Sequence, residues 1–297
     1  MHADQLAVDL PMVRALVDDQ FPQWRGLALR PVASQGTVNA IVRIGDRLAA
    51  RFPLQPADAS QARAWLAAEA AAARELRGAT RFATPEPVAL GEPGAGYPMP
   101  WSVQTWLPGV IATDDDPAAS LGFAEDVAEF IEGVRAMDLR GRVFSGSGRG
   151  GELAVHEEWV RLCLRESEGL LDVARLRRLW AELRELPRGG APDVMSHKDL
   201  IPGNVLVRDG RLAGVLDVGG LGPADPALDL VGAWHLLGRA GRQVVRTRLK
   251  CGDLEWQRGR AWAFVQALGA HWYYVVSNPP MSRMGATTLR RVLQEAA

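Results

Sequence analysis

The feature of this sequence that most constrains its fold is a polar cluster that runs directly into a β-hairpin. Residues 195–207 read MSHKDLIPGNVLV, with a His, an Asp and an Asn inside eight positions just before an apolar strand. Asp209 and Gly210 follow as the two-residue connection that most strongly indicates a hairpin, and this connection pairs Arg208 with Arg211. Asp, Pro, Gly and Asn are also common in ordinary turns, so the cluster alone indicates either a turn or a catalytic loop.

The register of this hairpin gathers oxygen atoms at one of its ends. Counting away from the loop places Asn204 opposite Val215, with Asp217 two residues further along the returning strand. Asp199 lies in the segment just before Asn204. Carboxylate and amide oxygens are the ligands that Mg²⁺ prefers, so the pattern predicts a magnesium site at this end of the hairpin.

The composition limits the fold and the partners. With 297 residues, 47% hydrophobic and 23% charged, the chain can bury a full core in one large domain or in two lobes. A net charge of −1 gives no reason to expect nucleic acid or an anionic membrane as a partner. No apolar run reaches membrane-spanning length, residues 1–12 show no signal segment, and Cys163 and Cys251 fit neither a disulfide framework nor a metal site. We expect a cytoplasmic protein that is a monomer or a weak dimer.

Hydrophobic patterning and turn residues give the order of the secondary-structure elements. Residues 9–20 predict a helix, and residues 29–53 predict three strands joined by turns. A long Ala-rich helix is expected over 58–77, and two further strands within 87–109. Beyond about residue 120 the chain is predicted to be mostly helical apart from the hairpin. The fold class is therefore α+β, with a small β-rich lobe followed by a larger helical lobe.

The polar cluster also matches the catalytic-loop pattern of protein kinases, H-[RK]-D-L-x-x-x-N followed by a strand that ends in Asp. His197, Lys198, Asp199 and Asn204 occupy its positions, and Asp217 ends the strand. Further segments in the same order are SQGTVNAIVRIGDRLAARFP, PVALGEPGAGYPMPWSVQTWLPG, DPALDLVGAW and QALGAHWYYVVSNP. On these motifs the chain resembles the aminoglycoside phosphotransferase and choline-kinase-like family, which shares the protein-kinase fold.

The resemblance implies a two-lobed, protein-kinase-like fold. Residues 1–105 would form the nucleotide-binding lobe, a small antiparallel sheet with one long helix. Residues 106–297 would form the helical lobe, with the catalytic loop and the acceptor site. The implied activity is that of a small-molecule kinase, which transfers the γ-phosphoryl group of ATP or GTP, with Mg²⁺, to a hydroxyl group of an antibiotic or a metabolite. Antibiotic resistance is the implied biological context.

The resemblance also implies a role for each polar residue of the motif. Asp199 is the expected catalytic base, because phosphoryl transfer requires a group that orients the acceptor hydroxyl. Asn204 and Asp217 are the expected Mg²⁺ ligands. His197 is expected to support the loop, and Asp229 to brace it by accepting backbone hydrogen bonds.

The nucleotide is expected to bind to the first lobe. Arg51 stands where the kinase fold usually has a lysine, in a chain that has only two lysines. Glu69 falls on a helical stripe with Trp65, Leu66 and Leu76, and a buried carboxylate is unfavourable unless it is paired, so we expect an Arg51–Glu69 ion pair. The further nucleotide contacts expected are Ser34, Gly36, Thr37, Gln104, Trp106 and Leu107.

The sequence leaves the acceptor open. A polycationic aminoglycoside requires an acidic pocket, whereas residues 218–297 hold five acids against ten Lys and Arg. The acids that are candidates to line an acceptor groove are Glu152, Glu157, Glu158, Glu166 and Glu168. Macrolides, other hydroxylated natural products and small metabolites fit the sequence equally.

The sequence leaves three alternatives to a small-molecule kinase. A nucleotide-binding pseudokinase or regulatory module is favoured by Arg51 in place of a lysine and disfavoured by the intact Asp199, Asn204 and Asp217. A protein-directed kinase is disfavoured because only eleven residues separate Asp217 from Asp229, too few for a long activation segment. A hydrolase is disfavoured because the chain has neither a nucleophile elbow nor a His-rich metal motif.

Overall fold

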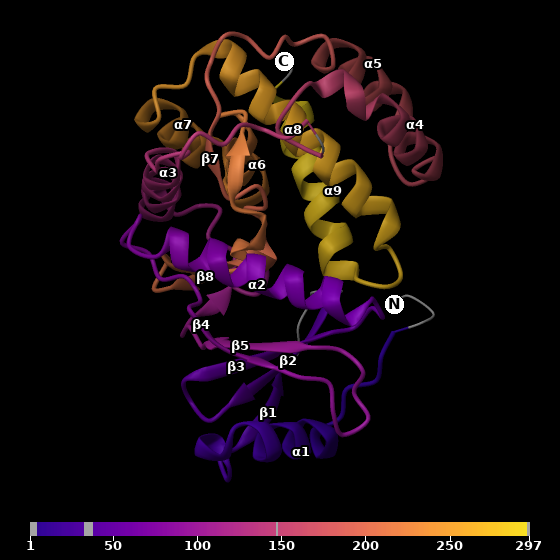
Figure 1. Ribbon diagram of the computed structural model, residues 1–297. Coiled ribbons are helices and arrows are strands. Elements are labelled where there is room, and N and C mark those ends of the chain that lie inside the picture. Colours follow the sequence, from indigo (N-terminus) through magenta and orange to yellow (C-terminus); the bar gives the residue numbers. More distant parts are fainter. Residues whose placement is uncertain (1–4, 33–37, 147, 296–297) are drawn as a thin grey trace. The chain divides into compact units, whose positions relative to one another are not determined.

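The computed structural model describes residues 5–32, 38–146 and 148–295 (Figure 1). The chain divides into two compact units. The first unit contains residues 1–77 and 83–108, and the second contains residues 78–82 and 109–297. The sequence did not indicate that the short segment 78–82 belongs with the second unit.

The first unit is built on a five-stranded antiparallel sheet with the strand order β1-β2-β3-β5-β4. Its strands are β1 (Leu29–Val32), β2 (Asn39–Ile44), β3 (Leu48–Pro53), β4 (Pro87–Gly91) and β5 (Trp101–Thr105). Its helices are α1 (Leu10–Gln20) and α2 (Ala59–Leu76). The two helices and five strands predicted for this part of the chain are confirmed.

Side-chain caps explain where both helices begin. The Asp9 carboxylate accepts a hydrogen bond from Met12 N–H at 2.8 Å, and the Asp58 carboxylate accepts from Ser60 and Gln61 N–H at 3.0 Å each. The first turn of a helix leaves N–H groups without an intrahelical partner, and these carboxylates satisfy them.

Aromatic rings fill the core of the first unit. Phe52 and Trp101 stack with 4.8 Å between their ring centroids, and Tyr97 packs edge-on against Phe52 at 5.3 Å. The Tyr97 hydroxyl donates a hydrogen bond to the Pro53 carbonyl at 2.7 Å, which satisfies its polar end inside the core. This packing fixes strand β3, on which Arg51 lies.

The second unit is mostly helical, as predicted. Its helices are α3 (Leu121–Arg135), α4 (Glu157–Glu166), α5 (Val173–Leu183), α6 (Val231–Leu236), α7 (Arg239–Arg248), α8 (Asp253–Tyr273) and α9 (Pro279–Gln294). Its strands are β6 (Val110–Ile111), β7 (Val194–Ser196), β8 (Val205–Arg208), β9 (Arg211–Val215) and β10 (Gly222–Ala224). Helices α8 and α9 pack side by side (Figure 1). No helix in the described parts of the chain is both long and apolar enough to cross a membrane.

The hairpin β8–β9 has the predicted loop but a shifted register beyond it. The pairing of Arg208 with Arg211 is confirmed. The prediction that Asn204 pairs with Val215 is wrong by one residue, because strand β9 has an extra residue, Ala213, between the partners of Leu206 and Val207, and Val205 is therefore the partner of Val215. A bulge adds one residue to one strand of a pair, and nothing in the sequence distinguishes this position. The strand β6 also pairs with β8, which makes a three-stranded sheet that the sequence did not predict.

Candidate active site

The loop that follows strand β7 is held by one buried carboxylate. Asp229 is 1% exposed and accepts three hydrogen bonds of 2.8 Å each, from the Ser196 hydroxyl, His197 N–H and Lys198 N–H. Lys198 has a φ of +72°, a left-handed conformation that side-chain-bearing residues adopt at a cost of about 1–3 kcal/mol. The hydrogen bonds to Asp229 stabilise this strained backbone and thereby fix the direction in which the next residue, Asp199, leaves the loop.

His197 joins the loop to the end of the hairpin. Its side chain is fully buried, and its ring packs edge-on against Phe130 with 6.0 Å between the centroids. Because Nε2 lies 3.0 Å from the Leu216 carbonyl oxygen, Nε2 carries the proton and donates it there. The other ring nitrogen, Nδ1, accepts from Asp199 N–H at 3.4 Å. The contacts of His197 are therefore internal to the protein.

Asp199 and Asn204 are in direct contact. The Asn204 amide nitrogen donates to Asp199 Oδ2 at 2.8 Å and to the Asp199 backbone carbonyl at 3.1 Å. Since the amide nitrogen faces Asp199, the amide oxygen of Asn204 faces the opposite way. The side chain of Asp199 is 32% exposed, so its carboxylate remains open to a ligand.

Asp217 emerges at the same end of the hairpin as Asn204. Leu216 N–H donates to the Asn204 carbonyl at 2.7 Å, and Asp217 is the next residue. Asp217 is exposed and has a φ of +55°, again a left-handed conformation. In the described residues no group of three or more His, Cys, Asp or Glu is placed to hold a metal. An amide oxygen and one carboxylate nevertheless fit Mg²⁺, which is usually held by one or two protein ligands together with substrate phosphates and water.

Two further side chains contact the Asp199 carboxylate, and the sequence did not identify either. Gln266, on helix α8, donates its amide N–H to Asp199 Oδ1 at 2.6 Å. Arg149, in the loop before helix α4, has its guanidinium 3.3 Å from the same oxygen. The Nη1 atom of Arg149 is buried and has no hydrogen-bond partner in the described part of the chain. Asp199 therefore faces a guanidinium and an amide as well as Asn204.

One positive charge is in contact with the Asp199 carboxylate among the described residues, that of Arg149. Burial lowers the pKa of the neighbouring Lys198, and the positive charge of Arg149 lowers it further, against the opposite effects of Asp229 and Asp193. The Lys198 ammonium itself lies beside Gly222.

In the first unit, Arg51 and Glu69 form the predicted ion pair. Arg51 lies on strand β3 and contacts the Glu69 carboxylate on helix α2, with side chains 12% and 24% exposed. The prediction that Trp65 shares the buried stripe is wrong, since this side chain is 58% exposed. The buried face of α2 follows Leu66 and Ala70, and Trp65 falls outside it.

Six further residues were predicted to bind nucleotide, and the structure describes three of them. The three that fall outside the described residues are Ser34, Gly36 and Thr37. Gln104 lies on strand β5, and Trp106 and Leu107 follow directly, all half-buried. Trp106 N–H donates to the Arg47 carbonyl at 2.7 Å, and the Arg43 guanidinium lies over its ring at 5.0 Å. These contacts extend the sheet by one residue past strand β5.

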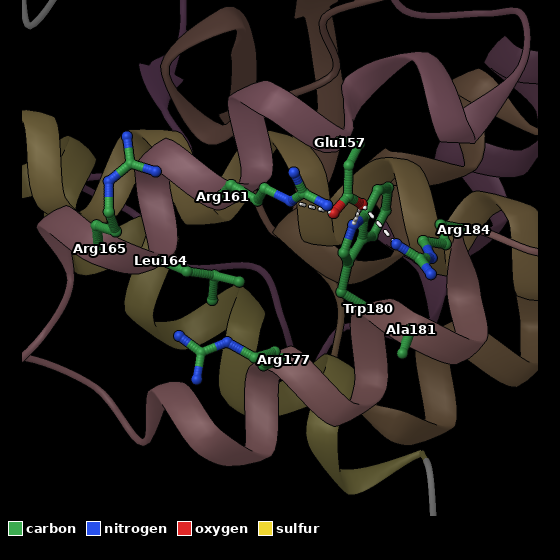
Figure 2. A pocket seen from close by; sticks show the side chains of 8 residues that line it. All are labelled: Glu157, Arg161, Leu164, Arg165, Arg177, Trp180, Ala181 and Arg184. Atoms are coloured by element: carbon green, nitrogen blue, oxygen red, sulfur yellow. Dashed lines mark hydrogen bonds and ion pairs between the residues drawn. The ribbon is translucent and has the colours of Figure 1, made fainter.

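A hollow of about 390 Å³ lies elsewhere in the second unit, between helices α4 and α5 (Figure 2). Glu157 is bound there by three donors, Arg161 Nε at 2.7 Å, Trp180 Nε1 at 2.7 Å and Arg184 Nη1 at 3.1 Å. These bonds lower the pKa of Glu157, the Trp180 contact most strongly. Three donors therefore hold Glu157 in this hollow, whose lining contains none of the residues predicted for catalysis.

Comparisons with known proteins show the family and the fold of the chain. A model of the phosphotransferase enzyme family matches residues 29–268. The structure of the GDP complex of an aminoglycoside 2'-phosphotransferase-IIIa is similar, with a TM-score of 0.70, 17% identity, and coverage of 98% of this chain and 100% of that one. The macrolide 2'-phosphotransferase MphH from Brachybacterium faecium has a TM-score of 0.63, 19% identity, and coverage of 94% and 98%. No curated protein sequence matches.

Proposed function

The chain belongs to the phosphotransferase enzyme family, and from this premise we propose that it transfers the γ-phosphoryl group of ATP or GTP to a hydroxyl group of a small molecule. The observation that carries the proposal is the environment of the Asp199 carboxylate. Its carboxylate is open to a ligand, it contacts Asn204 at 2.8 Å, and it sits on a loop whose backbone is fixed by Asp229. This is the arrangement that phosphoryl transfer requires, since the protein mainly positions groups and neutralises charge.

In the proposed reaction, Asp199 accepts a hydrogen bond from the acceptor hydroxyl and takes its proton. The hydroxyl oxygen forms a bond to the γ-phosphorus, the bond from that phosphorus to the β,γ-bridging oxygen breaks, and the nucleoside diphosphate leaves. Asn204 and Asp217 would hold Mg²⁺, which neutralises charge on the phosphates when it is bound. His197 and Asp229 act through the backbone of the loop alone.

The first unit would bind the nucleotide. Arg51 is proposed to contact the α- and β-phosphates while Glu69 orients it, since a guanidinium forms paired hydrogen bonds with both carboxylate and phosphate. The other proposed contacts are Ser34, Gly36, Thr37, Gln104, Trp106 and Leu107. One similar structure is described as a GDP complex and another as an ATP-containing complex, so both nucleotides belong in the test.

The acceptor is proposed to be a hydroxylated natural product or metabolite that is neutral next to its reacting hydroxyl. Similar proteins are described as aminoglycoside and macrolide phosphotransferases, which leaves the class of the acceptor open. The Arg149 guanidinium in contact with Asp199 disfavours an ammonium group at this position. The partnerless Nη1 of Arg149 would instead donate to a hydroxyl or carbonyl oxygen of the acceptor.

The test is release of nucleoside diphosphate by the purified protein with Mg-ATP and Mg-GTP in separate reactions. Aminoglycosides, macrolides and neutral polyols are supplied as acceptors, and Asp199→Asn is the control. We expect acceptor-dependent turnover that the control lacks. Nucleotide binding without turnover for any acceptor would instead favour a pseudokinase, and failure to bind either nucleotide would contradict the proposal altogether.

A further inference from the structure

A chain of hydrogen bonds leads from Asp199 into the core of the second unit. Gln266 donates to Asp199 Oδ1 at 2.6 Å through its amide nitrogen. The amide oxygen of the same side chain lies 3.2 Å from Nε2 of His235. Nδ1 of His235 lies 2.9 Å from the hydroxyl of Thr288. The chain therefore links the loop to three helices, α8, α6 and α9, in that order.

The inner part of this chain is shielded from water. His235 is 4% exposed and Thr288 is fully buried. Burial lowers the pKa of His235 to about 4, and the charges that act on it are those of Asp199, Arg149 and Arg291. The imidazole is therefore neutral near pH 7, so that one ring nitrogen donates a hydrogen bond and the other accepts one.

The position of the ring proton decides which way the amide of Gln266 points. With the proton on Nε2, His235 donates to the amide oxygen of Gln266, and the amide nitrogen is left to donate to Asp199. With the proton on Nδ1, Nε2 would accept, and Gln266 would have to turn its oxygen toward the Asp199 carboxylate. Two oxygen acceptors in contact without a proton between them are unfavourable. The Asp199 carboxylate, which only accepts hydrogen bonds when ionised, favours the first arrangement, and the Thr288 hydroxyl stabilises it by donating to Nδ1.

We propose that Thr288 and His235 hold Gln266 in the orientation that presents its amide nitrogen to Asp199, which makes Gln266 a positioning residue for the base. The proposal rests on the proposed role of Asp199. Within the part of the chain that the structure describes, Gln266 and Arg149 both donate to Oδ1, whereas Asn204 is the one donor to Oδ2. A carboxylate oxygen accepts about two hydrogen bonds, so this arrangement reserves a position on Oδ2 for the acceptor hydroxyl.

The helix pair α8–α9 offers a matched control. His271 and Ser282 form a second histidine–hydroxyl contact between these helices, at 3.1 Å from Nδ1 to Oγ. The Ser282 hydroxyl also contacts the His271 carbonyl at 2.8 Å. None of the contacts of this pair in the described residues involves Asp199 or Gln266, so Ser282→Ala removes a buried hydroxyl from the same interface without touching the chain.

The experiment compares Thr288→Val, Thr288→Ser and Ser282→Ala in the full-length protein. The first measurement is ¹⁵N NMR of the histidine rings, which reports the proton position on His235 without any acceptor present. The second is kcat and KM for nucleotide and acceptor. In the NMR measurement we expect the proton on Nε2 of His235 in the wild type and in Thr288→Ser, and changed ¹⁵N signals of the His235 ring in Thr288→Val. In the kinetic measurement we expect Thr288→Val to lower kcat about tenfold and to change KM by no more than about twofold. Ser282→Ala should keep the wild-type kcat.

Two results would overturn the proposal. One is a wild-type His235 with its proton on Nδ1. The other is a Thr288→Val protein whose kcat falls no further than that of Ser282→Ala, because that result would assign Thr288 to packing alone. Failure of the proposed function looks different: the wild type would then show no acceptor-dependent turnover, or Asp199→Asn would keep it, while the NMR measurement would still report the proton position on His235.

Discussion

Asp229 and Asp199 are two carboxylates on either side of the same loop, and their surroundings differ in kind. Asp229 is 1% exposed and is saturated by two backbone N–H groups and one hydroxyl. Asp199 is 32% exposed and is met by side chains from separate elements, including Gln266 and Arg149. A carboxylate saturated by backbone donors holds a conformation, whereas a carboxylate met by side chains at the surface is available to a ligand. The comparison separates the residue that builds the site from the residue that would act in it.

The largest effect on stability is expected from Asp229→Ala. This change leaves two buried N–H groups and the Ser196 hydroxyl without their acceptor, at about 1–3 kcal/mol each, so we expect the free energy of unfolding to fall by about 3 kcal/mol or more. Urea denaturation measures this loss. Ser196→Ala removes only one of the three bonds and should lower the same free energy by about 1 kcal/mol. Equal losses of unfolding free energy in Asp229→Ala and Ser196→Ala would contradict the role assigned to the two backbone hydrogen bonds of Asp229.

Asp126 provides a second saturated carboxylate, with ionic partners. It is 1% exposed and accepts hydrogen bonds from Arg211 at 2.6 Å, from Arg81 at 2.7 Å and from Leu212 N–H at 3.1 Å. Burial alone raises the pKa of Asp126, but these bonds outweigh it and lower the pKa below its ordinary value.

We therefore expect Asp126→Asn to lower the free energy of unfolding by about 2 kcal/mol at pH 7. The pKa of Asp126 is lower in the folded protein than in the unfolded chain. Its contribution to the free energy of unfolding is therefore fully present above the ordinary carboxyl pKa of about 4, and it is lost as the pH falls through the lower pKa of the folded protein. Urea denaturation at a series of pH values should show the difference from the wild type shrinking below about pH 4. A constant difference over that range would contradict the assigned ion pairs.

A smaller effect is expected at Arg149, on selectivity. Arg149→Ala removes a positive charge beside Asp199, so we expect kcat/KM for an amino-substituted acceptor, relative to its neutral analogue, to rise about tenfold, or about 1.4 kcal/mol. Steady-state kinetics on the two acceptors measures the ratio. Arg161→Ala, in the hollow between helices α4 and α5, is the control and should leave the ratio unchanged. An unchanged ratio in Arg149→Ala would remove the argument for a neutral acceptor.

The sequence predicted the parts of the site that are close together along the chain. The proximity of Asp199 to Asn204 and the direction of the hairpin follow from a short motif and a two-residue loop, both of which are local. The Arg51–Glu69 pair followed from the unfavourable burial of an unpaired carboxylate. The bulge in strand β9 was missed because it depends on how the strand packs.

The sequence did not predict the groups that reach Asp199 from a distance. Arg149 is 50 residues away and Gln266 is 67 residues away, and only tertiary packing brings them together. One local signal was available, since Gln266 is the single polar residue in the run AWAFVQALGA of helix α8. A lone polar side chain in a buried helix requires a partner, and that requirement would have marked Gln266 as a residue to explain.

The most direct test of the account is to measure stability and turnover together for Asp199→Asn. Because the carboxylate of Asp199 is open and its donors are side chains, we expect the free energy of unfolding to fall by only about 1 kcal/mol, well short of the loss expected for Asp229→Ala. Acceptor-dependent release of nucleoside diphosphate should fall about a thousandfold, the range for loss of a general base. A variant that keeps its turnover, or that loses stability as Asp229→Ala is expected to, would contradict the division of roles between these two carboxylates.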